Sequence, residues 1–362
     1  MVTLFEKLKS TYRNKTVLIT GHTGFKGSWL VKILNELGAS VWGYALAPQQ
    51  DNDLFYLIQG DTICNSHIAD IRSVEELKKV VNEAKPDFIF HLAAQPLVRL
   101  SYEIPTETFA VNAIGTANLL DAVRALDKKC NLVLITTDKV YHNYEWDYPY
   151  REVDRLGGYD PYSASKACTE LVIDSFRNSF FNPNLYSVHQ KSIGTGRAGN
   201  VIGGGDWSKD RLLPDIARSL ANNNHVIIRN PKAVRPWQHV LEPLVGYLIL
   251  GAKLDDNGVQ YGEAFNFGPH ISDALSVEKM VELSIAAWGH GSYEVEQHPN
   301  QLHEAGLLKL DINKAINKLG WQPRWTASKA VEMTMDWYKR YQEEPDNINA
   351  VIKSQIMDYF NE

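Results

Sequence analysis

A short apolar run that leads straight into three spaced glycines restricts the fold of this 362-residue chain more than any other feature. Residues 16–20 read TVLIT and residues 21–27 read GHTGFKG, after which a segment with helical spacing begins. A strand, a glycine-rich turn and a helix N-terminus together form a unit that binds the pyrophosphate of a dinucleotide. Glycine permits the tight turn and lets the backbone come close to the phosphates. The residues predicted to form this site are Gly21, Thr23, Gly24, Phe25, Lys26 and Gly27.

Apolar runs and helical segments alternate through the first half of the chain. Short apolar runs bounded by turns occupy residues 16–20, 39–46, 87–94 and 131–137, and helical periodicity appears at 29–37, 73–84 and 106–126. This alternation is typical of a parallel sheet covered by helices on both faces. We therefore predict an α/β fold of the Rossmann type, a doubly wound parallel sheet with a smaller mixed α/β lobe that binds the substrate.

The alternation stops near residue 190. We assign residues 1–190 to a dinucleotide-binding domain and 191–362 mainly to the substrate-binding lobe, with a soft boundary that the chain crosses more than once. Residues 187–196 (SVHQKSIGTG) are expected to form an unusually polar strand, in which Gln190 and Lys191 would be awkward inside a buried parallel sheet. The run from Leu244 to Ala252 is expected to form a short buried helix at most, and a helical tail is expected from about Thr326.

Composition excludes several classes of protein. The formal net charge of -6 argues against a non-specific nucleic-acid binder. The three cysteines have no paired spacing, which fits a reducing compartment and argues against disulfides and a zinc site. No signal peptide or membrane-spanning segment is apparent, so we expect a cytoplasmic protein without a metal site.

A second group of polar residues indicates redox chemistry. Tyr162 and Lys166 are spaced i, i+4 on a predicted helix that runs to about Phe181, so they share one face. A nearby cation favours the phenolate, and we expect it to lower the pKa of the tyrosine toward working pH. Residues 137–139 (TDK) follow a predicted strand, at the edge of the sheet where ligands bind. The predicted catalytic residues are Thr137, Asp138, Lys139, Tyr162 and Lys166.

The nucleoside end of the dinucleotide is less clearly marked. The acidic residue expected after the second strand is missing, since that strand leads into APQQ and Asp51 lies too far along the chain. No arginine for a 2′-phosphate stands there either, so the residues leave NAD and NADP open. Asp70 and Ile71 lie between the runs at 39–46 and 87–94, where the third strand of such a fold would end. They are candidates for contact with the adenine ring. A surface aspartate before a helix starting at Ser73 explains Asp70 nearly as well.

Six long strings spread over the chain carry a specific resemblance. They read TGHTGFKGSW (20–29), AAQPLVRLSY (93–102), GGYDPYSASKA (157–167), RAGNVIGGGDW (197–207), RPWQHVLEPL (235–244) and HEAGLLKLD (303–311). Together with HLAAQ (91–95) and Asn112 they resemble extended short-chain dehydrogenases/reductases that act on nucleotide sugars, and more narrowly the CDP-glucose 4,6-dehydratases. The resemblance implies NAD as cofactor, a CDP-sugar as substrate, a homodimer, and a role in deoxyhexose synthesis for lipopolysaccharide O-antigen.

The resemblance also assigns residues to the two ligands. Leu92, Ala93, Ala94 and Asn112 would join the cofactor site. A sugar diphosphate needs cations, and the guanidinium groups of Arg235 and Arg211 suit it, although either could instead form a structural ion pair. The residues expected to bind the substrate are Gln95, Arg99, Asn200, Arg211, Arg235 and His303.

The mechanism implied by the resemblance has three steps. Tyr162 deprotonates the sugar 4-hydroxyl, which Thr137 orients, as a hydride leaves C4 for NAD. Lys139 then removes the C5 proton while Asp138 protonates the departing 6-hydroxyl, and the hydride finally returns to C6. Sibling dehydratases carry Asp-Glu where this chain has Asp138-Lys139. A lysine base must be partly neutral, and we expect burial or the charge of Lys166 to lower its pKa.

Two departures from the family pattern, one after Lys139 and one in the polar segment 187–196, keep other readings open. Val140 and His142 stand where the family usually carries a cysteine and an acidic residue, and His142 would alter the charge around Lys139. A 4-epimerase or a dehydratase for another nucleoside-diphosphate sugar is the enzyme alternative, and Asp138-Lys139 argues against the epimerase. A nucleotide-sensing regulator is the non-enzyme alternative, which would be expected to lack the tyrosine or the substrate cations.

Overall fold

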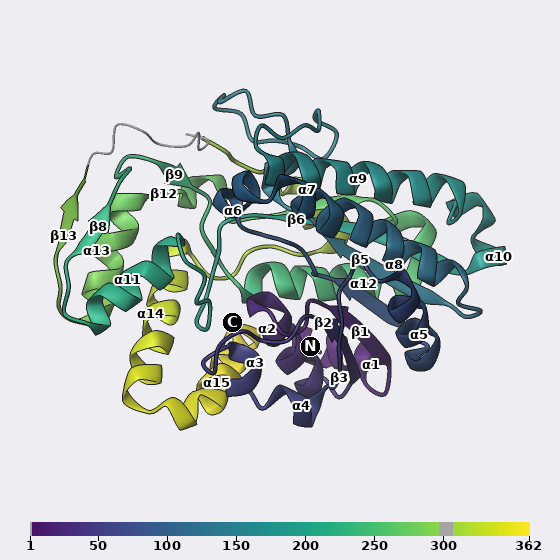
Figure 1. The fold of residues 1–362 in the computed structure, drawn as a ribbon, viewed down its shortest axis with the longest axis horizontal. Helices are drawn as coiled ribbons and strands as arrows, with labels where there is room; N and C mark the ends of the chain where they lie inside the picture. Colours follow the sequence, from purple (N-terminus) through teal and green to yellow (C-terminus); the bar gives the residue numbers. More distant parts are fainter. Residues whose placement is uncertain (1, 297–306) are drawn as a thin grey trace.

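A parallel sheet of seven strands forms the centre of the computed structural model, which describes residues 2–296 and 307–362 (Figure 1). The strand order is β11-β6-β5-β4-β1-β2-β3. The strands are β1 Thr16–Thr20, β2 Ser40–Ala45, β3 Asn65–Ile68, β4 Phe88–His91, β5 Cys130–Ile135, β6 Lys191–Ala198 and β11 Ala264–Phe267. Because β1 pairs with β2 on one side and β4 on the other, the strand order reverses at β1, and a crevice opens there at the carboxyl ends. The predicted Rossmann-type fold is confirmed.

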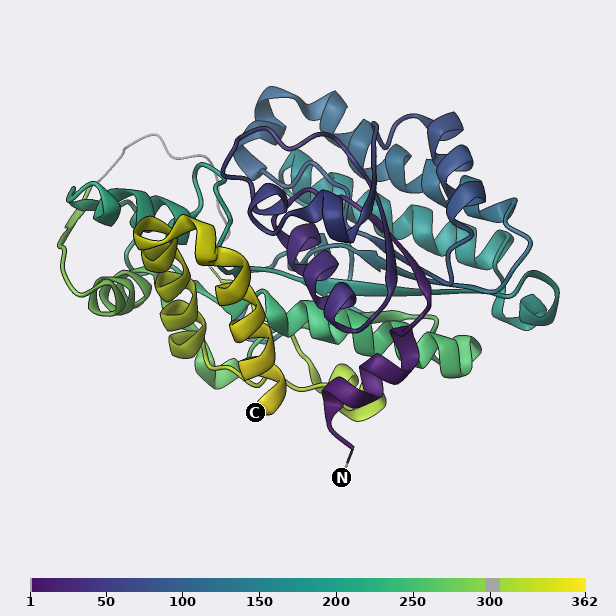
Figure 2. The ribbon, with the colours of Figure 1, turned by 90° about the horizontal axis from the view of Figure 1, so that it is seen from below.

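Helices cover both faces of this sheet, which Figure 2 shows nearly edge-on. Strand side chains alternate between two hydrophobic clusters: Val17 and Ile19 of β1 lie in one and Leu18 in the other. The first cluster is covered by α1 Leu4–Tyr12, α2 Phe25–Glu36 and α12 Leu241–Tyr261, and the second by α5 Val74–Ala84, α8 Gly115–Arg124 and α9 Pro161–Ser179. Burial on both faces explains why the strands read as nearly continuous apolar runs.

A second group of elements packs beside the sheet, on the left in Figure 1. Its helices are α11 Leu212–Ala221, α13 Val277–Trp288 and α14 Ala327–Glu343, and its two-stranded pairs are β7 Val201–Ile202 with β10 Gln238–His239, β8 Val226–Ile228 with β13 Tyr293–Val295, and β9 Val234–Arg235 with β12 Leu275–Ser276. The chain returns to the sheet layer for β6, β11 and α12, all beyond residue 190. The domain boundary at that residue stays a prediction.

The last helix joins the two parts. Helix α15, Ile348–Asn361, packs on α14 and reaches α2, where Lys353 Nζ lies 3.1 Å from Glu36 Oε2. The rings of Phe5 and Phe360 meet edge to face at 5.2 Å, so the ends of the chain lie close together (Figure 2).

Three expected elements differ in the structure. Residues 187–189 belong to the short helix α10, Tyr186–His189, and Gln190 has a positive φ of 54°, so β6 starts only at Lys191, whose ammonium donates to His189 O at 2.6 Å. The polar strand predicted from residue 187 is therefore wrong before 191. Helix α12 spans 21 residues, with a kink at Asn257, rather than a short segment, and it packs on β5 and β6. The single helix predicted at 106–126 is divided into α7 Pro105–Phe109, a π-helical turn η1 Ala110–Ile114, and α8.

The remaining short elements connect these layers. They are α3 Leu54–Leu57, α4 Gly60–Ile63, α6 Val98–Glu103, η2 Asp138–Val140, η3 Pro183–Leu185, η4 Ile271–Asp273, η5 Ala315–Leu319 and η6 Pro345–Asn347. Among the described residues, no helix combines the length and apolar character needed to cross a bilayer.

Candidate active site at the carboxyl ends of the strands

The glycine turn after β1 is shaped by two close backbone approaches. Gly21 has a φ of 77°, and a Cβ there would lie 2.7 Å from Ala93 N, at the end of β4. A Cβ on Gly27 would lie only 2.0 Å from Gly21 O. Because any side chain at these positions would collide with backbone, the turn holds α2 tightly against the ends of β1 and β4.

The N-terminus of α2 is open to an anion. Gly24 is its N-cap and offers no side-chain hydrogen bond, and the first turn contains no acidic residue. The N–H groups of that turn therefore keep the capacity to bind phosphate oxygens, and the helix dipole favours negative charge there. Beside the turn, Thr23 Oγ1 donates to Leu46 O at 2.9 Å and so fixes the end of β2.

A cleft of about 2140 Å³ runs from this turn across the strand ends into the second group of elements. Most of the residues predicted to bind the cofactor line it: Gly21, Thr23, Gly24, Phe25, Lys26, Gly27, Asp70, Ile71, Leu92, Ala93 and Ala94. Asp70 does not cap α5, whose N-cap is Ser73. Its carboxylate instead accepts hydrogen bonds from Arg72, which lower its pKa.

The predicted catalytic residues line the same cleft. Asp160 caps α9 by accepting from Ser163 N at 2.9 Å, and Tyr162 N donates to Ser101 Oγ at 3.1 Å, so the start of the helix is fixed. Lys166 lies one turn further along and donates from Nζ to Ile135 O, 3.1 Å away, at the end of β5. The helix thus presents the phenol and the ammonium side by side at the strand ends.

The pKa of Tyr162 differs from the expectation. Burial raises it to about 12, outweighing a hydrogen bond with Thr137 that lowers it. Lys166 donates to the Ile135 carbonyl, and burial lowers the pKa of Lys166 itself to about 8. The expected depression of the tyrosine pKa is therefore wrong, and a phenolate would need additional positive charge in the cleft.

The Thr-Asp-Lys segment turns directly after β5. Thr137 Oγ1 donates to Asp138 Oδ1 at 2.9 Å, and Asn200 Nδ2 donates to Asp138 Oδ2 at 3.2 Å. Asp138 is buried, whereas Lys139 is half-buried and faces the cleft. An acid and a basic side chain thus stand beside Tyr162.

A further cation lies deep in the site. Burial, together with the charges of Arg211 and Lys166, lowers the pKa of Lys26 to about 7 despite the opposing effect of Asp138. Lys26 therefore lies in the same cleft as Asp138, close enough for the two charges to interact.

Arginines line the part of the cleft beyond the strand ends. Arg211 Nη1 lies 2.6 Å from Asp206 Oδ2, and Arg99 Nη1 lies 2.9 Å from Asp210 Oδ1. Arg235 donates to Val234 O at 3.0 Å. Arg229, 3.6 Å from Asp210, also lines the cleft and was not predicted. Each of the three predicted arginines thus lines the cleft and has a hydrogen-bond or ion-pair partner in the protein.

Two predicted residues do not line the cleft, and a third lies outside the described residues. Gln95 donates from Nε2 to Leu97 O and Thr108 Oγ1, and Asn112 donates from Nδ2 to Gln95 O and Ser165 Oγ, so both amides hold the loop after β4 against α9. Neither lines the cleft, and their contact with ligands stays a prediction. His303 lies outside the described residues.

A buried ion pair that anchors α9, the helix of Tyr162 and Lys166, was not predicted from the sequence. Glu170, one turn beyond Lys166, is paired with Arg197 of β6 and accepts from the Thr136 hydroxyl. The charges of Glu170 and Arg197 can be read from the sequence, but nothing in the local pattern indicates that α9 and β6 bring these two side chains together.

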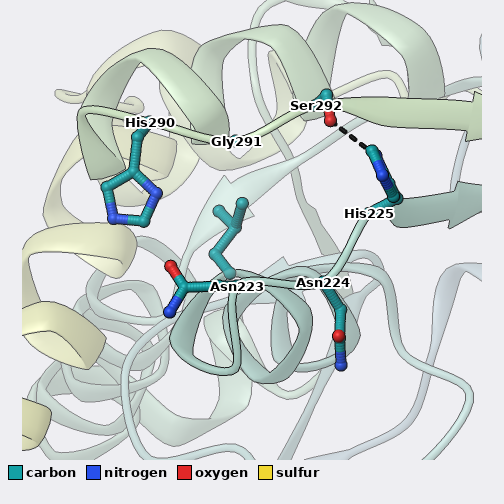
Figure 3. A pocket seen from close by; sticks show the side chains of 7 residues that line it. Asn223, Asn224, His225, His290, Gly291 and Ser292 are labelled. Carbon is teal, nitrogen blue, oxygen red and sulfur yellow. Dashed lines mark hydrogen bonds between the residues drawn. The ribbon is translucent and has the colours of Figure 1, made fainter.

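A second, small hollow lies between the end of α11 and the turn before β13 (Figure 3). His225 Nδ1 and Ser292 Oγ lie 2.6 Å apart at its rim, and Asn223 and His290 face it. No group of three or more metal-binding side chains occurs within residues 2–296 and 307–362.

Comparison with known proteins assigns the family. The profile of a family described as GDP-mannose 4,6 dehydratase matches residues 18–334. The chain belongs to this family. Helices α1 and α15 lie outside the matched part.

Relatives of this 4,6-dehydratase family member differ widely in similarity. The CDP-glucose 4,6-dehydratase of Salmonella typhimurium is 48% identical over 353 residues, covering 98% of each chain. The CDP-paratose 2-epimerase of Salmonella typhi is 28% identical and covers 89% of this chain and 98% of its own.

Solved structures show the same fold at lower identity. The dTDP-glucose 4,6-dehydratase from Streptomyces venezuelae, with NAD and TYD bound, has a TM-score of 0.77 at 21% identity and covers 91% of this chain and 99% of its own. UDP-glucose 4-epimerase from Thermotoga maritima, with UDP-glucose, also has a TM-score of 0.77, at 22% identity, with 91% and 99% covered. The fold of this family member is therefore shared by dehydratases and epimerases.

Proposed function

We propose that this protein is an NAD-dependent hydro-lyase that converts CDP-D-glucose to CDP-4-dehydro-6-deoxy-D-glucose and water. The observation that carries the proposal is the position of Asp138 and Lys139 beside Tyr162 in the cleft that begins at the dinucleotide turn. Oxidation and 4-epimerisation require the tyrosine and threonine only. An additional acid and base are what elimination of water requires.

The residues present fit a bound NAD. The close-packed glycine turn, the uncapped N-terminus of α2 and the Leu92-Ala93-Ala94 wall offer a cradle for a pyrophosphate and its nucleosides. When bound, NAD supplies a hydride acceptor for the sugar C4 and returns the same hydride to C6. Its positive nicotinamide would also oppose the effect of burial, which raises the pKa of Tyr162.

Three side chains then transfer protons, and a fourth orients the substrate. Tyr162 accepts the proton of the 4-hydroxyl, with Thr137 orienting that hydroxyl. Lys139 removes the C5 proton, which the new 4-ketone makes acidic, and Asp138 donates a proton to the 6-oxygen as the C6–O bond breaks. A proton returns to C5 when C6 is reduced. The sequence is redox-neutral and its net change is the loss of one water.

The substrate assignment combines chemistry with the relative. Arg99, Arg211 and Arg235 line the cleft, and guanidinium groups bind phosphate oxygens in a bidentate manner. Cytidine and glucose are proposed from the 48% identical CDP-glucose 4,6-dehydratase. The product is a 4-keto-6-deoxy sugar nucleotide, which suits deoxyhexose synthesis for a surface polysaccharide.

We further propose a cytoplasmic homodimer. Leu171 on α9 and Ile114 at the start of α8 are 61% and 55% exposed, and these two helices pack side by side. Apolar side chains on neighbouring helices suit contact with a second copy. Cys64, Cys130 and Cys168 are all unpaired thiols, which suits a reducing compartment.

One assay tests the function directly. Purified protein with NAD is incubated separately with CDP-, dTDP-, UDP- and GDP-hexoses, and products are identified by mass and by the absorbance of the base-treated ketone. Loss of one water from CDP-glucose is the expected result. Interconversion of 4-epimers without mass change would instead favour the epimerase, and loss of water only from another nucleotide sugar would replace CDP-glucose as substrate.

A further inference from the structure

The carboxylate of Asp138 is held by a donor on each oxygen. Thr137 Oγ1 donates to Oδ1 at 2.9 Å and Asn200 Nδ2 donates to Oδ2 at 3.2 Å. The side chain is 1% exposed, so water does not replace either donor. Its orientation therefore depends on these two contacts.

The backbone of Gly199 lies directly against this carboxylate. A Cβ on Gly199 would lie 2.0 Å from Asp138 Cγ and Oδ2 and 2.1 Å from Oδ1. Such distances are far below van der Waals contact, and both the carboxylate and the strand end are buried. Any side chain at residue 199 would therefore displace the carboxylate.

The neighbouring Asn200 owes its direction to an unusual backbone. Its φ is 50°, in the left-handed region that asparagine tolerates better than most residues. Gln238 fixes the backbone of residues 199 and 200. Its main-chain N donates to Asn200 O at 3.2 Å. Its Nε2 donates to Gly199 O at 3.1 Å and to Phe267 O at 2.9 Å. The amide of Asn200 is thus aimed at Asp138 by a fixed frame.

We propose that Asn200 is a positioning residue for elimination, holding Asp138 in the orientation in which it protonates the leaving 6-hydroxyl. This inference rests on the proposed function. The family resemblance expects Asn200 on the substrate, whereas here its amide serves the acid. The main chain of Tyr162 is held separately, by Ser101 and by the helix that Asp160 caps, so loss of the Asn200 amide is expected to act first on Asp138 and hence on elimination.

The test separates oxidation from elimination in single turnovers. Asn200→Gly deletes the amide and keeps a residue that adopts a positive φ. With NAD and CDP-glucose, the variant is expected to form reduced nicotinamide at the wild-type rate and then accumulate it. Formation of the dehydrated product should slow by about 10-fold, as for loss of one buried hydrogen bond.

A second variant reaches the same carboxylate from another direction. Gly199→Ala leaves the Asn200 amide in place and displaces Asp138 sterically, so it is expected to accumulate reduced nicotinamide as well. The matched control is Asn223→Gly, an asparagine with a φ of 55° beside the small hollow of Figure 3 and outside the lining of the large cleft. It should leave both steps unchanged.

The outcomes discriminate clearly. A raised KM with oxidation and elimination slowed together, and no accumulation of reduced nicotinamide, would assign the amide to the substrate and overturn the inference. Wild-type elimination in both Asn200→Gly and Gly199→Ala would overturn it too. If the wild-type protein releases no water from any nucleoside-diphosphate hexose, the proposed function fails first, and the inference with it.

Discussion

Arg197 and Glu170 form a two-pronged ion pair inside the protein, with Nε 2.9 Å from Oε1 and Nη2 3.0 Å from Oε2. The pair joins β6 to α9 one turn beyond Lys166, and the Glu170 charge opposes the burial that lowers the pKa of that lysine. The charge state of Lys166, a predicted catalytic residue, thus depends in part on a side chain that is held by the central sheet.

Removal of one partner of this pair should be costly. Arg197→Met leaves the Glu170 carboxylate buried and unpaired, and we expect a loss of about 3–5 kcal/mol in the free energy of unfolding. Arg197→Met combined with Glu170→Met should recover much of it, because no charge then stays buried. Urea unfolding of the wild type, both single variants and the double variant measures the coupling. A single variant as stable as the wild type would contradict the prediction.

Tyr162→Phe should stop the reaction at its first step. Without the hydroxyl nothing accepts the 4-hydroxyl proton, so we expect the formation of reduced nicotinamide from CDP-glucose to slow by about 10²–10⁴-fold. Stopped-flow absorbance of the reduced nicotinamide is the measurement, with an unchanged melting temperature as the control for folding. Wild-type turnover in this variant would refute the role of Tyr162.

Two glycines of the cofactor turn offer a matched comparison. Gly27→Ala places a methyl group 2.0 Å from Gly21 O, so the turn must open, and we expect loss of NAD binding and a lower melting temperature. Gly24→Ala meets no protein atom closer than 3.5 Å and should melt near the wild-type temperature without ligand. Thermal melting and titration calorimetry with NAD distinguish the two. Equal stability of both variants would show that the turn is less rigid than its geometry indicates.

Glu242 predicts a pH dependence of stability. Its carboxylate, at the start of α12, accepts from Trp325 N at 2.7 Å and from the Tyr359 hydroxyl at 2.7 Å, and burial raises its pKa to about 7. A carboxyl whose folded pKa lies above its unfolded value of about 4.3 stabilises the fold at low pH and loses that contribution as pH rises toward about 7.

The test compares wild type with Glu242→Gln, which stays neutral. Between about pH 4.5 and pH 7 the wild-type free energy of unfolding should fall relative to the variant by up to about 3 kcal/mol. Guanidinium unfolding at several pH values measures the difference. Parallel pH profiles would show that Glu242 titrates normally.

The sequence predicted the elements that local patterns encode. The runs at 16–20 and 131–137 correspond to β1 and β5, and the glycine turn leads into α2 as expected. Strand β3 was less visible, because NSHI is a short polar edge segment. The predicted strand at 187–190 failed where Gln190 takes a positive φ, which an apolar count does not detect.

The site residues show the same difference between what local patterns predict and what they do not. Tyr162, Lys166 and residues 137–139 were found from spacing and strand ends. Contacts between distant segments were not: the Asn200 amide and Asp138 are 62 positions apart, and Gln238 is 39 positions from Gly199. The pKa of Tyr162 was misjudged because spacing indicates a neighbouring cation but not the extent of burial.

Strand β11 completes the edge of the sheet with residues Ala264–Phe267, and its neighbour β6 begins at Lys191. During synthesis the nascent chain therefore exposes an unpaired edge of β6 until β11 has left the ribosome. Helix α2 packs on α3, α4 and α12, and the part of its surface that contacts α15 stays open until that helix emerges. Packing around the helix that follows the glycine turn is thus completed by a segment far along the chain.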